Sequence, residues 1–106
     1  MQGYQLTFYT QEGRHHGGTP LAEWLMNLAK AQGALGATLF KADESFGHHG
    51  RLHAARFFEL AEQPIGVMVA VDEDTCARLL SNIESAGETV FYVKIPVEYG
   101  RTGLPD

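Results

Sequence analysis

The chain shows the order strand–helix–strand twice, and this order constrains the fold more than any other feature of the sequence. The first half runs from Tyr4 to Lys41 and the second from Ile65 to Val97. Each half has the size of a compact crossover unit, and such crossovers are right-handed. Two units that share one sheet predict an α+β fold, the ferredoxin-like βαββαβ sandwich. Its four-stranded antiparallel sheet would have both helices on one face.

The first half of the chain contains two predicted strands, and only the first shows a clear alternation of apolar and polar residues. Tyr4 to Thr10 alternates, with Leu6 and Phe8 on one face, which indicates a half-buried strand. Gln11 to Gly18 is a loop by composition. Ala34 to Lys41 is expected to be the second strand.

The helix between these strands has a start and an end signal. Thr19 and Pro20 predict its first turn, because Thr is a good N-cap and Pro at the first helical position loses only an N–H that has no partner anyway. Gly33 is expected to end it as a C-terminal cap. The apolar stripe consists of Leu21, Leu25 and Leu28.

The second half begins with the most apolar stretch of the chain. Ile65 to Val71 reads IGVMVAV, as expected for a central strand. Asp72 to Asp74 start the next helix, where negative charge suits the helix dipole, and Gly87 closes it. Thr89 to Val97 is the last strand, and Pro96 indicates that this end lies at an edge of the sheet or at the terminus of the strand. The buried stripe of the helix is expected to be Cys76, Leu79, Leu80 and Ile83.

A sheet covered by helices on one face leaves its other face without a cover. Apolar residues are spread over both faces of the strands, among them Leu39, Met68, Phe91 and Val93. Because a large exposed apolar patch is unusual on a soluble monomer, we expect an oligomer.

Composition excludes several classes of protein. The 106 residues suit one domain, 1–106, and the formal net charge of -5 argues against nucleic acid and anionic membrane as partners. The single cysteine rules out an internal disulfide and fits a reducing cytoplasm. No apolar run approaches the roughly 20 residues that span a bilayer, and no export signal is visible, so we expect a cytoplasmic protein.

The segment FGHHGRLHAARFF, Phe46 to Phe58, concentrates groups that could bind an anion. It holds three of the five histidines, two of the eight Lys/Arg residues and no acid. Glycines let backbone N–H groups approach an anion, Arg suits two-point recognition of phosphate or carboxylate, and His titrates near physiological pH. The residues concerned are Gly47, His48, His49, Gly50, Arg51, His53 and Arg56.

The same histidines leave a metal site open as an alternative. On a helix, His49 and His53 would share a face and could hold a divalent transition metal, and His48 adjoins them. Adjacent histidines diverge on regular backbone, however, and no zinc spacing with Cys is present. His15-His16 forms a second such pair. A polar loop without chemistry is the third interpretation.

Catalysis is not indicated by any motif. Cys76 lies on the apolar stripe of its helix, which favours a buried structural thiol over a nucleophile. No nucleophile elbow or metalloprotease signature occurs. We therefore expect no enzymatic activity.

Three stretches together resemble a known family. GTPLAEWLMNLAKAQGALGATLFKA, SFGHHGRLHAA and ELAEQPIGVMVAVDED are similar to the PII-like proteins of unknown function (domain-of-unknown-function family 190), which are related to the nitrogen-regulatory PII signalling proteins. The resemblance covers about Tyr4 to Val97. It implies a ferredoxin-like subunit, a homotrimer with inward-facing sheets, and a role as a small-molecule sensor. It also implies a mobile T-loop-like segment at about 43–56, with a nucleotide bound in the cleft between subunits near its base.

Two short matches carry the family's ligand contacts over to this chain. Phe46-Gly47 matches the start of the PII loop. Arg101-Thr102-Gly103, in the tail 98–106, resembles the Arg-Thr-Gly whose arginine reaches nucleotide phosphates. With the loop residues chosen for their chemistry, the candidate anion- or nucleotide-binding residues are Phe46, Gly47, His48, His49, Gly50, Arg51, Arg56, Arg101, Thr102 and Gly103.

The chain departs from the PII pattern at its phosphate loop. The glycine-rich, lysine-containing loop is missing, and three acids at Asp72 to Asp74 repel phosphate instead. An adenine nucleotide would need fewer phosphate contacts, as a monophosphate or cyclic nucleotide does.

The resemblance, together with the residues of the loop, thus implies a PII-like regulator. It would bind a small anionic ligand, an adenine nucleotide being the candidate, and act through its loop on a partner such as a membrane transporter or channel. The alternative is a metal-binding protein that uses His48, His49 and His53 on the same scaffold.

Overall fold

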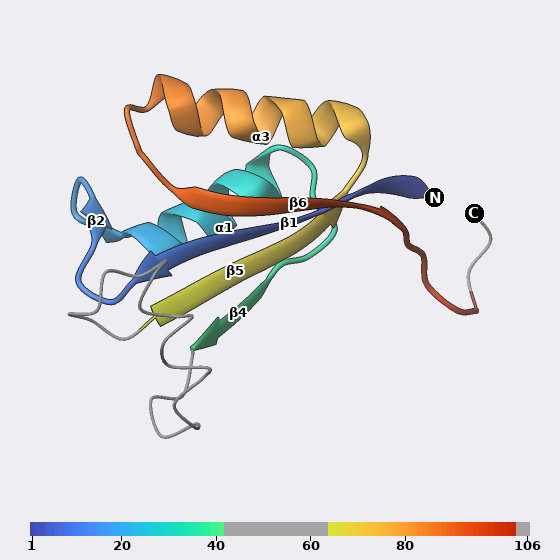
Figure 1. Ribbon diagram of the computed structural model, residues 1–106, viewed down its shortest axis with the longest axis horizontal. Helices are drawn as coiled ribbons and strands as arrows, with labels where there is room; N and C mark the ends of the chain where they lie inside the picture. Colours follow the sequence, from blue (N-terminus) through green and yellow to red (C-terminus); the bar gives the residue numbers. More distant parts are fainter. Residues whose placement is uncertain (42–63, 104–106) are drawn as a thin grey trace.

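The computed structural model describes residues 1–41 and 64–103, and these residues form a sheet with two helices on one face (Figure 1). The sheet has four antiparallel strands in the order β4-β5-β1-β6. Its strands are β1 (Gln2–Gln11), β4 (Thr38–Lys41), β5 (Pro64–Val71) and β6 (Phe91–Glu98), and the helices are α1 (Leu21–Ala31) and α3 (Glu73–Ser85). The predicted ferredoxin-like architecture is confirmed.

The strand order follows from two interleaved crossovers. Strand β1 pairs with β5 on one side and with β6 on the other, so that Leu6 faces Val69 and Lys94. Strand β5 of the second half therefore lies between β4 and β1 of the first half, and β1 lies between β5 and β6 of the second half. Within each half the two strands are not paired with each other, so the four-stranded sheet needs strands from both halves.

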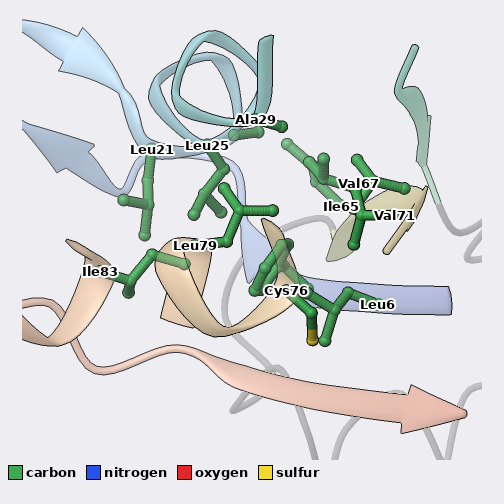
Figure 2. Packing of buried hydrophobic residues seen from close by; sticks show 13 residues of the cluster. Leu6, Leu21, Leu25, Ala29, Ile65, Val67, Val71, Cys76, Leu79 and Ile83 are labelled. Carbon is green, nitrogen blue, oxygen red and sulfur yellow. The ribbon is translucent and has the colours of Figure 1, made fainter. Parts of the chain in front are cut away.

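The core lies between the sheet and the helices (Figure 2). Leu6 and Phe8 are buried on the helix face of β1, as the alternation predicts, and Leu25 and Leu79 pack over them from the helices. Full burial of such side chains stabilises the fold by about 1.5–3 kcal/mol each. Cys76 is 1% exposed, which confirms the buried interpretation.

The start of the first helix differs from the prediction. Helix α1 begins at Leu21, and Pro20 occupies the N-cap position without a side-chain cap. Thr19 and Pro20 instead form β3 (Thr19–Pro20), which pairs in a hairpin with β2 (His15–His16), a strand inside the predicted loop. The predicted Thr cap is wrong because the hairpin supplies the partner: the Leu21 N–H donates to the carbonyl oxygen of Arg14 at 2.8 Å.

The other ends of the helices and strands agree more closely with the prediction. Gly33 and Gly87 have φ values of 100° and 78°, the left-handed conformation in which glycine ends a helix. Asp72 is the N-cap of α3, and its carboxylate accepts a hydrogen bond from the Thr75 N–H at 2.7 Å. The predicted strand 34–41 is shorter in the structure, because only Thr38 to Lys41 pairs with β5.

The face of the sheet opposite the helices carries exposed apolar side chains. Phe40, Phe91 and Ile95 are 39%, 43% and 45% exposed on this open face. Leu39 and Tyr92, on the helix side of the two edge strands, are 40% and 44% exposed. The expected uncovered face is therefore present, and it extends around both edge strands.

Candidate functional site: a polar cluster at one end of the sheet

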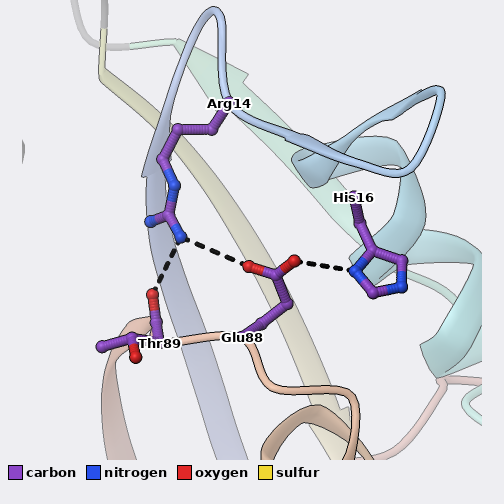
Figure 3. Close-up of polar contacts among 4 residues, drawn as sticks. All are labelled: Arg14, His16, Glu88 and Thr89. Atoms are coloured by element: carbon purple, nitrogen blue, oxygen red, sulfur yellow. Dashed lines mark hydrogen bonds and ion pairs between the residues drawn. The ribbon is translucent and has the colours of Figure 1, made fainter.

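A polar cluster joins the hairpin β2–β3 to the turn between α3 and β6 (Figure 3). Arg14 Nη2 donates to the carbonyl oxygen of Thr89 at 3.0 Å and lies 3.5 Å from Glu88 Oε1. His16 Nδ1 lies 2.7 Å from the other carboxylate oxygen, Oε2. One carboxylate thus faces two basic side chains that lie 74 and 72 positions earlier in the sequence.

Glu88 is the most enclosed member of this cluster. Its side chain is 18% exposed, whereas those of Arg14 and His16 are each 34% exposed. A carboxylate withdrawn from water in this way needs opposite charge or hydrogen-bond donors, and the two basic residues supply them. The cluster therefore fastens the hairpin to the far half of the chain.

The His16 ring is also held by an aromatic contact. It stacks on Trp24 of α1 with ring centroids 4.3 Å apart and planes inclined by 32°. His15, the next residue back, places Nδ1 2.9 Å from the carbonyl oxygen of Gly13. The two adjacent histidines therefore use different partners and do not converge on a shared metal position.

The described part of the chain has no metal cluster. No group of three or more His, Cys, Asp or Glu side chains in residues 1–41 and 64–103 is arranged to hold a metal ion. The candidate ligands His48, His49 and His53 lie outside the described residues, so the metal alternative for that segment stays a prediction.

A second ion pair lies at the same end of the sheet. Lys41, the last residue of β4, places Nζ 3.6 Å from Glu12 Oε2, and both side chains are more than half exposed. Such a surface pair contributes little to stability. This end of the sheet therefore carries side chains of both charges.

A hollow at the opposite end of the sheet is lined by two carboxylates. This hollow of about 410 Å³ lies beside the start of β1 and the end of β6. Glu73 and Glu98 both line it, and two carboxylates repel a phosphate group. The residues around the hollow are Gln2, Gly3, Tyr4, Glu73, Pro96, Val97 and Glu98.

Asp72 confirms the structural interpretation of the acidic helix start. The backbone N–H of Thr75, followed by its hydroxyl, holds the pKa of the Asp72 carboxyl below its ordinary value. The carboxylate is thus committed to capping α3.

The structure describes only some of the site residues that the sequence predicts. Arg101 and Thr102 are exposed in the segment after β6, and Gly103 has a φ of 82°. This segment lies at the opposite end of the sheet from the hairpin (Figure 1). The remaining predicted ligand residues lie outside the described residues: Phe46, Gly47, His48, His49, Gly50, Arg51 and Arg56.

Arg14 and Glu88 were not predicted as site residues. Their contact joins segments from the two halves of the chain, and no local spacing or motif marks it. A pairing over this distance in the sequence becomes visible only once the hairpin and the α3–β6 turn have been brought together.

Comparison with known sequences places most of the chain in one family. The family model DUF190, described as "Uncharacterized ACR, COG1993", matches residues 3–98. A UPF0166 protein from Aquifex aeolicus (strain VF5) is 29% identical over 80 residues, which cover 74% of this chain and 76% of that protein.

Solved structures with the same fold are PII-like proteins. One from Thermus thermophilus, assigned as a PII-like signaling protein, matches with a TM-score of 0.60 and 17% identity, over 92% of this chain and 87% of that chain. CPII from Thiomonas intermedia K12, bound to ADP, AMP and acetate, matches with a TM-score of 0.58 and 20% identity, over 92% of this chain and 90% of that chain. At these identities the likeness concerns the fold.

Proposed function

Since the chain belongs to the DUF190 family, we propose that it is a PII-like regulatory protein that binds a small anionic ligand and catalyses no reaction. The observation that carries the proposal is the family match over residues 3–98, combined with a PII-like fold.

An adenine nucleotide is the proposed ligand, bound in the cleft between subunits. CPII, which shares the fold, is known bound to ADP and AMP. We favour a nucleotide with few phosphates, because the chain lacks a glycine-rich phosphate loop and the carboxylates of Asp72 to Asp74 repel phosphate. Bicarbonate is a second anion to test, because CPII is also known bound to it.

The proposed assembly is a homotrimer. Its support is the open face of the sheet, on which Phe40, Phe91 and Ile95 are each more than one third exposed. Covering this face with other copies of the chain would remove apolar surface from water, the main driving force of stable association.

The proposed output is a change in what a partner protein can bind. Ligand binding would alter the segment at about 43–56, and a partner would bind only one of its states, which requires the ligand to favour that state. That segment lies outside the described residues. On family grounds we propose a membrane transporter or channel as the partner. We propose the cytoplasm as the location, in keeping with the single cysteine. None of the described helices is long and apolar enough to cross a bilayer.

Isothermal titration calorimetry tests the ligand directly. We expect AMP or ADP to bind saturably, and we expect Arg51→Gln and Arg101→Gln each to weaken binding about tenfold, because charge-assisted hydrogen bonds are lost. Lys30→Gln on α1 is the control for loss of one positive charge. If neither nucleotide nor bicarbonate binds, the sensor proposal fails. Binding of Zn²⁺ that His48→Ala and His49→Ala abolish would favour the metal alternative.

A further inference from the structure

We infer that Arg14 is an anion-binding residue and that Glu88 and His16 control its availability. The inference rests on the proposed function and deepens it, since it names a residue for the anionic group of the ligand and the contact that regulates it. Neither the sequence pattern nor the family resemblance pointed to Arg14 or Glu88, and His16 was considered only as one of a pair of candidate metal ligands.

The two contacts of Arg14 differ in quality. Its Nη2 lies 3.0 Å from the carbonyl oxygen of Thr89, which is an ordinary hydrogen bond, but 3.5 Å from Glu88 Oε1, at the limit of one. The backbone carbonyl therefore positions the guanidinium, while the carboxylate holds it only loosely. The side chain is one third exposed, so a dissolved anion can reach it.

Two donor atoms of the Arg14 guanidinium, Nε and Nη1, have no hydrogen-bond partner in residues 1–41 and 64–103. An oxyanion could bind these donors first. It could bind at two points once it displaces Glu88 from Nη2, since guanidinium matches the geometry of phosphate and carboxylate oxygens.

Glu88 is held more closely by His16 than by Arg14. Its Oε2 lies 2.7 Å from His16 Nδ1, a distance typical of a short charge-assisted hydrogen bond. Stacking on Trp24 fixes the imidazole in the orientation that makes this contact. The carboxylate thus places one oxygen close to His16 and the other at the longer distance from Arg14 (Figure 3).

The expected ligand group is a small oxyanion. A phosphate of a nucleotide and free bicarbonate share this chemistry, and both would compete with Glu88 for the guanidinium. The further ion pair at this end of the sheet, Lys41 with Glu12, is already internally paired. The Lys41 side chain is more exposed than that of Arg14, 52% against 34%, but its ammonium lacks the planar fork with which a guanidinium binds two oxygens of one anion.

Three substitutions separate the roles of the cluster. Arg14→Gln removes the cation and should weaken anion binding about tenfold. Glu88→Gln removes the competing charge and should tighten binding about two- to fivefold, because a loose, partly exposed ion pair is weak. His16→Gln returns Glu88 to Arg14 and should weaken binding. Lys30→Gln, at the far end of α1, is the matched control and should change nothing.

The experiment titrates the protein with AMP, adenosine, inorganic phosphate and bicarbonate, and follows both the heat of binding and the fluorescence of Trp24. Trp24 is the only tryptophan, and it stacks on His16, so its emission should change when an anion displaces Glu88. Adenosine has no phosphate and distinguishes a nucleotide phosphate from contacts to the base. The change in emission should be absent in His16→Gln.

The outcomes distinguish this inference from the proposed function. Nucleotide binding with an unchanged affinity in Arg14→Gln overturns the inference alone. Bicarbonate or phosphate binding that depends on Arg14, without nucleotide affinity, supports the inference and rejects the nucleotide ligand. No response to any anion overturns both. If Glu88→Gln disturbs the hairpin, the Trp24 emission will already differ before any ligand is added, and Arg14→Lys is then used instead. Lysine keeps the positive charge but lacks the planar guanidinium, so this variant should lose part of the affinity for the anion.

Discussion

Phe40 lies over Gly66 on the open face of the sheet. The two residues face each other between β4 and β5, and a Cβ on Gly66 would lie 2.1 Å from the Cζ of the Phe40 ring. The ring thus takes the space of the side chain that the central strand lacks at this position. Glycine in a strand often marks such a close approach.

Gly66→Ala should therefore destabilise the fold by about 1–3 kcal/mol, the usual cost of overpacking. The added methyl must push the Phe40 ring away from the strand. Urea unfolding followed by circular dichroism measures the change. The cost should be smaller in a Phe40→Ala background, where the ring is absent. Gly36→Ala, at a position where an added Cβ meets nothing within 4 Å, is the matched control. An equal cost in both backgrounds would contradict the contact.

Asp72→Asn should make stability less dependent on pH. The hydrogen bonds from Thr75 lower the pKa of Asp72 in the folded state. The carboxylate therefore stabilises the fold above its ordinary pKa of about 3.9, and this contribution is lost as the pH falls through the lowered value. Asparagine keeps an oxygen acceptor but not the charge.

The measurement is the urea midpoint from pH 7 to pH 2.5. The wild type should be more stable than Asp72→Asn at pH 7, and the difference should shrink below about pH 4. Asp74→Asn, which removes the charge two positions later and leaves the cap in place, is the matched control. A difference that stays constant down to pH 2.5 would argue against the cap.

Cys76 should resist thiol reagents in the folded protein. Its side chain is 1% exposed, and burial raises its pKa, although the charge of Lys94 opposes this effect. Because the thiolate is the reactive form, iodoacetamide at pH 8 should label the native protein very slowly and the urea-unfolded protein fully. Mass spectrometry reads the result. Rapid labelling of the native chain would mean that α3 opens readily.

Ile95→Lys should weaken the proposed trimer. Ile95 is 45% exposed on the open face of β6, and a lysine there would place a charge in the interface. Light scattering at micromolar concentration should show the wild type at three times the monomer mass and the variant at a lower mass. Glu84→Lys on the helical side should leave the mass unchanged. A wild type that is monomeric would reject the trimer.

Much of the fold could be predicted because it depends on local patterns. The alternation at Leu6 and Phe8 and the apolar run Ile65 to Val71 mark strands, and the glycines after both helices mark the helix ends. Each of these signals depends on backbone geometry or burial within a short stretch of the sequence. The start of α1 escaped prediction for the opposite reason. Thr19 and Pro20 carry a sound helix-start signal, but pairing with His15 and His16 satisfied the same backbone groups in another way.

The sequence by itself determined the order of elements, the buried stripes and the family, since each of these depends on residue types at short, regular spacing. Only the tertiary structure decided that Glu88 lies between Arg14 and His16. Electrostatic contacts depend on distance in space, and the fold brings together at 2.7 Å two residues that are 72 positions apart in the chain. No periodicity in the sequence encodes that proximity.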